Sequence, residues 1–107
     1  MRNFASSVTD LRQKVNGPVE SFPFECGWAE EAVYFVTVES VVDTTNRLSL
    51  RVQLSADGLR WADEGSLLVI DGVDTRFVRV RHFGGFLRLV GESTGEAVLT
   101  IRLALKG

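Results

Sequence analysis

Two residues with reactive side chains, Cys26 and His82, occur once each in the sequence. A cysteine nucleophile needs a histidine within hydrogen-bond contact and a third group that orients the imidazole. The sequence offers no such third group and nothing that brings the two residues together. We therefore interpret Cys26 as a buried thiol and His82 as an imidazole beside a turn. We expect no catalytic residue, so Cys26→Ser and His82→Ala should both fold and keep any activity.

The sequence also lacks the spacings that hold a metal ion or a cofactor. A structural zinc site takes four ligands, and one cysteine and one histidine cannot supply that set. Gly84-Gly85 precedes no Lys-Ser or Lys-Thr pair, so it does not match a phosphate-binding loop. We interpret it as a tight turn between two strands. We expect no cofactor and no metal ion.

A group of carboxylates lies in predicted turns that the parity of strand crossings places at one end of the fold. Carboxylate clusters can bind calcium, although no calcium-loop spacing is present here. Turns are also acidic simply because they are solvated, and we favour that interpretation while leaving calcium binding open. The carboxylates are Asp43, Asp71, Asp74, Glu92 and Glu96.

Arginine and phenylalanine alternate on the outward faces of two predicted strands around Gly84-Gly85. One face carries Phe77, Arg79 and Arg81, and the next carries Phe86, Arg88 and Val90. If the turn is tight, the two faces are cross-strand neighbours. Arginine interleaved with phenylalanine can stack bases or sugars, or anchor a protein interface. In the other interpretation, arginine stems simply lie across exposed phenylalanine rings on a solvated sheet.

The longest strand-like run, Ala32 to Val42, is apolar in both phases of its alternation. An outer strand of a monomeric sandwich should have one wet face. We therefore expect the N-terminal segment or a second subunit to cover this strand. The candidate interface residues are Val33, Phe35, Phe77, Arg79, Arg81, Phe86 and Arg88.

Alternation of apolar and polar residues positions all of these side chains and predicts an all-β fold. It is clearest over Leu48 to Ser55. Asp71-Gly72 predicts a type I′ hairpin in which Ile70 faces Val73, and Ser93-Thr94-Gly95 predicts a turn. The other predicted strands are Val19 to Cys26 (irregular, because of Pro23), Ala32 to Val42, Ser66 to Ile70, Val73 to His82, Phe86 to Val90 and Ala97 to Leu105.

Seven or eight short strands predict an antiparallel β-sandwich or flattened barrel, jelly-roll-like in character. Residues 19–107 would form this single domain. Residues 1–18 would form an N-terminal arm or a short helix, since Val8, Leu11 and Val15 have helical spacing. The predicted core residues are Leu50, Val52, Leu54, Val78, Val80, Leu87, Leu89, Leu99, Ile101 and Leu103.

Composition sets limits on partners and location. A formal net charge of -2 favours neither nucleic acid nor an anionic membrane as a partner. No apolar run is long enough for a signal peptide or a membrane span. We expect a cytoplasmic protein, or one carried in a virion or another assembled particle.

Two segments resemble known families: Leu50 to Trp61, which contains Ser-Ala-Asp-Gly-Leu-Arg-Trp, and Arg76 to Val80. The pattern resembles discoidin-type (coagulation-factor type C) galactose-binding-like modules, and also small β-sandwich proteins of phage virions and tails. The resemblance implies a β-sandwich in which Asp57-Gly58 turns the chain and Trp61 seals one end of the core. This chain is shorter than a discoidin module and lacks its paired cysteines and export signal. No ligand-binding residue can therefore be carried over.

These observations favour association over catalysis. Our first interpretation is a non-catalytic structural or self-assembling subunit, of the kind found in phage-derived or virion-like assemblies. Its partners would be further copies of the chain or a larger protein assembly. The alternative is a small ligand-binding module, with carbohydrate as the ligand that the discoidin resemblance implies.

Overall fold

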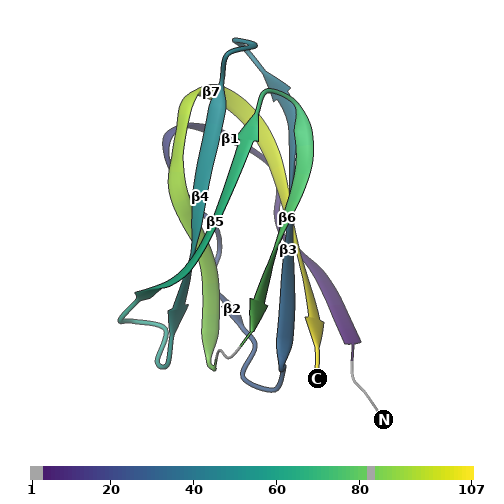
Figure 1. Ribbon diagram of the computed structural model, residues 1–107, viewed down its shortest axis with the longest axis vertical. Coiled ribbons are helices and arrows are strands. Elements are labelled where there is room, and N and C mark those ends of the chain that lie inside the picture. The colour runs from purple at the N-terminus through teal and green to yellow at the C-terminus, as the bar shows by residue number, and fades with distance from the viewer. Residues whose placement is uncertain (1–3, 82–83) are drawn as a thin grey trace.

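The computed structural model describes residues 4–81 and 84–107, which form seven β-strands (Figure 1). No helix in this described part of the chain is long and apolar enough to cross a membrane. The all-β antiparallel architecture predicted from the sequence is confirmed. The strands are β1 (Phe4–Glu20), β2 (Phe24–Glu25), β3 (Glu31–Val41), β4 (Arg47–Ser55), β5 (Ala62–Asp71), β6 (Asp74–Arg81) and β7 (Phe86–Lys106).

Strand β7 organises the sheet because it pairs on both edges along most of its length, on either side of its bend. One edge pairs with β1, and β2 adds a short ladder at the start of β7. The other edge pairs first with β4 and then with β3. The sheet therefore has the order β5-β4-β7-β3-β6 and folds into two layers that share β7 and β1. Its end strands β5 and β6 meet near their connecting turn, so the sheet is nearly closed into a flattened barrel (Figure 1).

The prediction of a turn at Ser93-Thr94-Gly95 is wrong, because β7 continues through these residues as one bent strand. Ser93 is buried, and its hydroxyl donates to the Gly95 carbonyl oxygen at 2.6 Å. Strand β1 follows the bend with a register shift between Val15 and Gly17. Turn-forming residues here bend a strand whose ladder with β1 continues on both sides.

The helical alternative for residues 1–18 is also wrong, since the described residues from Phe4 onward form strand β1. The ladder with β7 satisfies the backbone groups that a helix would have bonded internally. Register shifts around Asp10 and a positive φ of 46° at Arg12 interrupt the alternation. Leu11 is consequently exposed, whereas Val15, which shares the predicted helical face, is buried.

The predicted type I′ hairpin at Asp71-Gly72 is replaced by a link between the two layers. Gly72 has a φ of 66°, but Asp71 does not have the positive φ that a type I′ turn requires. In the described residues, β5 pairs with β4 and β6 pairs with β3. The Gly72 N–H donates to the Asn46 carbonyl oxygen at 2.9 Å, so the β5–β6 and β3–β4 turns lie side by side.

The alternation correctly predicts the core. Eight of the ten predicted residues are buried, and Leu54 and Val78 are partly buried against them. The expectation that Trp61 seals one end of the core is wrong, because its side chain does not belong to the core cluster. Its ring instead stacks on the Arg88 guanidinium, with Arg88 Cζ 4.1 Å from the ring centroid. The eight buried residues are Leu50, Val52, Val80, Leu87, Leu89, Leu99, Ile101 and Leu103.

Candidate interaction surface

The pairing of β3 with β6 brings five of the seven candidate interface residues together on the outer face of one layer. Phe35 lies opposite Phe77, and Val33 lies opposite Arg79. Arg81 lies opposite Glu31, and its guanidinium is 3.2 Å from the Glu31 carboxylate. The sequence indicated Phe77, Arg79 and Arg81 by their outward phase, and Val33 and Phe35 by a strand that is apolar in both phases. It did not predict that the two strands are neighbours.

The aromatic residues on this face form a small cluster that remains open to solvent. The ring centroids of Phe35 and Phe77 are 6.1 Å apart, and the ring planes are inclined at 42°. Arg79 Cζ lies 5.2 Å from the Phe77 ring centroid, a cation–π contact. Phe35 is 40% exposed and Phe77 is 53% exposed.

The same face continues across β7 and β1, where sequence analysis did not place it. Arg102 pairs with Phe35, Ala104 with Val33, and Lys106 with Glu31. Phe4, on β1, lies opposite Lys106 and is 67% exposed. Arg102 and Ala104 lie on the outward phase of the last predicted strand, so the sequence contained them. They could be assigned to this face only once the neighbouring strands were known.

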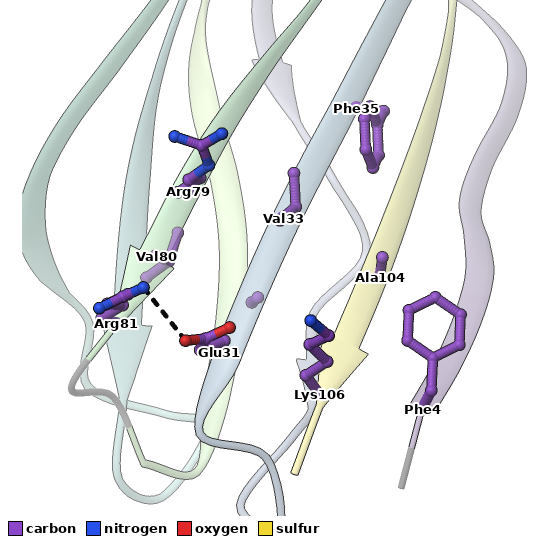
Figure 2. A pocket seen from close by; sticks show the side chains of 10 residues that line it. Phe4, Glu31, Val33, Phe35, Arg79, Val80, Arg81, Ala104 and Lys106 are labelled. Atoms are coloured by element: carbon purple, nitrogen blue, oxygen red, sulfur yellow. Dashed lines mark ion pairs between the residues drawn. The ribbon is translucent and has the colours of Figure 1, made fainter. Parts of the chain in front are cut away.

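A groove of about 320 Å³ crosses this face between the side chains of Phe4, Phe35 and Arg79 (Figure 2). Figure 2 shows the rings of Phe4 and Phe35 at one side of the groove, Arg79 and Arg81 at the other, and Lys106 between them. We call the surface the basic aromatic face. Its residues are Phe4, Val8, Glu31, Val33, Phe35, Phe77, Arg79, Arg81, Arg102, Ala104 and Lys106.

The basic aromatic face is positively charged although the chain is not. It holds four cationic side chains and one carboxylate, Glu31, and therefore carries a formal charge of +3, whereas the chain carries -2. The remaining surface must then carry a balance of -5. Bulk composition conceals this separation of charge, because it averages over both layers.

Phe86 and Arg88 do not belong to this face, which corrects the prediction that they neighbour Phe77. The start of β7 pairs with β4 and β2, whereas β6 pairs with β3 in the other layer. The ring of Phe86 lies beside the Gly58 turn. Phe83 and His82 lie outside the described residues, so the predicted turn at Gly84-Gly85 is described only in part.

Arg88 instead anchors a polar network on the second layer. Its guanidinium pairs with Glu20, and its Nε donates to Gln53 Oε1 at 2.9 Å. Gln53 Nε2 donates to Asp63 Oδ1 at 2.9 Å, and Arg51 Nε donates to the same oxygen at 3.1 Å. A polar groove of about 520 Å³ lies over this network, between β1 and β4.

The acidic turns do share an end of the fold, as strand parity predicted (Figure 1). Their carboxylates are engaged singly rather than as a cluster. Asp71 pairs with Arg47 at 2.7 Å, Asp74 with Arg76 at 3.1 Å and Glu96 with Lys14 at 2.8 Å. Within the described residues, no three acidic, cysteine or histidine side chains group in a way that could hold a metal ion.

Cys26 is fully buried, and its thiol donates to the Phe24 carbonyl oxygen at 3.5 Å. Burial, and secondarily the charge of Glu25, raises the pKa of the Cys26 thiol from 9.0 to about 11. Burial also raises the pKa of Tyr34 above its ordinary value of 10.0, with smaller contributions from Cys26 and Asp10. Both groups are thus held in their neutral forms. His82 lies outside the described residues, so nothing places it near Cys26.

We expect the free energy of unfolding to fall as the pH rises from about 9 towards 11. The unfolded Cys26 thiol ionises near pH 9.0, whereas the folded thiol keeps its proton up to about pH 11. The stabilisation is complete below pH 9 and is lost through this window, by about 3 kcal/mol for Cys26. Urea unfolding of wild type and Cys26→Ser between pH 8 and pH 11 checks this. Parallel pH profiles for the two proteins would contradict it.

Comparisons with known proteins give the fold and no family. No family model matches the chain, and no curated protein is significantly similar in sequence. The solved structure of the SPBc2 prophage-derived protein YomS has a TM-score of 0.67 at 12% identity, over 100% of this chain and 96% of YomS. The PBSX exported protein XepA has a TM-score of 0.72 at 4% identity, over 94% of this chain but only 36% of XepA.

The F5/8 type C domain of a Bacteroides fragilis protein is a further match. Its TM-score is 0.54 at 11% identity, over 92% of this chain and 90% of that domain. At such low identities the matches establish a shared fold and nothing about activity. Both resemblances noted in the sequence, to discoidin-type modules and to phage sandwich proteins, are thus found again as similarities of fold.

Proposed function

We propose that this chain is a non-catalytic structural subunit that associates with further copies of itself through the basic aromatic face. The observation that carries the proposal is the exposed pair Phe35 and Phe77, flanked by Arg79 on an outer face that also exposes Phe4. Exposed contiguous apolar patches rimmed by polar residues mark interaction sites. Aromatic residues and arginine are also the residue types enriched in interface cores.

The setting that we propose is an assembly of phage origin. The prophage-derived protein YomS shares the fold and is matched over nearly the whole of both chains. This supports the proposed setting by fold alone. The association itself rests on the surface of this chain.

We expect wild-type protein to be oligomeric at micromolar concentration and Phe35→Glu to be monomeric. A carboxylate at the centre of a desolvated contact removes the apolar anchor and buries an unpaired charge, which should weaken association at least about thirtyfold. Sedimentation velocity of both proteins measures this. Phe22→Glu is the matched control, because Phe22 is 71% exposed and is not part of the basic aromatic face. A folded wild-type protein that stays monomeric would remove the support for self-association.

The alternative function is a small ligand-binding module, and the polar groove over Arg88 favours it. The side chains at this groove are already hydrogen-bonded to one another, and Trp61 stacks on Arg88 beside them. Preorganised polar groups of this kind fix the orientation of a small polar ligand. Calorimetric titration with oligosaccharides would test it, with Gln53→Ala as the variant that should lose binding.

A further inference from the structure

The charge of the basic aromatic face limits what can cover it, if the proposed function is correct. A two-fold dimer joins the same surface of both copies. Both sets of four cations would then be opposed across one interface, with only Glu31 from each copy to offset them. Because like charges placed together in an interface are strongly unfavourable, a face-to-face dimer is disfavoured. The occupant of the face should be apolar and without excess positive charge.

A surface of that kind lies on β5, at one end of the strand order. Leu67 and Val69 alternate along its outward side and are 73% and 43% exposed, and Val73, in the turn that follows β5, is 62% exposed. Asp63 and Asp71 lie on the same side, at the two ends of β5. We call these residues the β5 surface. It combines exposed aliphatic side chains with two carboxylates that are each paired with an arginine of β4, so its own charges balance.

The cations nearest the β5 surface are already neutralised. Arg47 and Arg51 lie on the neighbouring strand β4. Arg47 pairs with Asp71 at 2.7 Å, and Arg51 pairs with Asp63 at 3.1 Å. The adjoining turn adds the carboxylate of Asp43, whose pKa is lowered by hydrogen bonds from Thr45. The β5 surface is therefore neutral to acidic, and it does not repel four cations.

We propose that copies of this chain associate head to tail, with the basic aromatic face of one copy on the β5 surface of the next. Phe35 and Phe77 would pack on Leu67 and Val69, while the cationic rim would meet a surface whose own cations are neutralised by carboxylates. The two surfaces are different, so each contact leaves one surface of each kind free. Such a heterologous contact continues into a ring or a filament instead of stopping at a dimer.

The test combines two variants that each disable one surface. Leu67→Lys places a cation where the basic face should dock, and Phe35→Glu disables the face itself. Each variant alone should be monomeric, with association at least about thirtyfold weaker than wild type. Mixed in equal amounts, they still offer one intact surface each, so they should form a 1:1 dimer and nothing larger. Sedimentation velocity with one variant fluorescently labelled distinguishes these species.

Three results would overturn the head-to-tail contact. In the first, Leu67→Lys assembles like wild type while Phe35→Glu does not, which indicates a face-to-face contact and leaves the proposed function standing. In the second, both variants are monomeric and the mixture is too. In the third, wild type itself is monomeric, which counts against the proposed function as well. Thermal unfolding confirms that the variants fold, and Val69→Lys replaces Leu67→Lys if that protein does not.

Discussion

Val52→Asp should reduce the free energy of unfolding by at least about 3 kcal/mol, a large part of the stability of a domain of this size. Val52 is 1% exposed, in the middle of β4, and lies opposite Leu89 on β7. A carboxylate at that position has no cation within the apolar core to pair with, so it must be buried unpaired, or protonated, or the strands must separate. Urea unfolding followed by circular dichroism measures the change.

The matched control for this prediction is Val42→Asp. Val42 is 78% exposed beside the β3–β4 turn, so the same substitution there leaves the new carboxylate in water. We expect its stability to stay within about 0.5 kcal/mol of wild type. If Val52→Asp proved as stable as Val42→Asp, the inward phase assigned to β4 would have to be abandoned.

Gly91→Ala should be comparably damaging, by about 3 kcal/mol or more, although it adds only a methyl group. A Cβ at Gly91 would overlap the Ser49 carbonyl oxygen and lie 2.8 Å from its carbonyl carbon and 2.9 Å from Leu50 Cα. These are backbone atoms of β4, held in the ladder with β7, so no side chain can rotate away to make room. The two strands would have to move apart at the point where β7 approaches its bend.

Gly84→Ala is the control for the methyl group itself. A Cβ at Gly84 meets no atom of the described residues within 4 Å. Equilibrium unfolding should therefore give a value close to wild type for Gly84→Ala and a much lower one for Gly91→Ala. Equal stability of the two variants would mean that the close approach of β4 to β7 is not required.

The candidate surface illustrates how far the sequence could lead. Outward phase identified Phe77, Arg79 and Arg81, because a side chain's face depends only on the strand to which it belongs. Val33 and Phe35 were identified because their strand is apolar in both phases of its alternation. Phe86 and Arg88 were grouped with them on the assumption that strands joined by a short connection pair with each other. That assumption fails here, since β6 pairs with β3 in one layer and the start of β7 pairs with β4 in the other.

Local sequence determined the all-β class and the inward phase of the core strands, because the period-2 alternation is a property of each strand by itself. The tertiary structure alone decided which strands are neighbours. It turned Ser93-Thr94-Gly95 into a bend within β7 and residues 4–20 into a strand, because long-range ladders satisfy the backbone there. The basic aromatic face exists only through that pairing: its charge comes from β3, β6 and β7, which are distant in sequence and adjacent in the sheet.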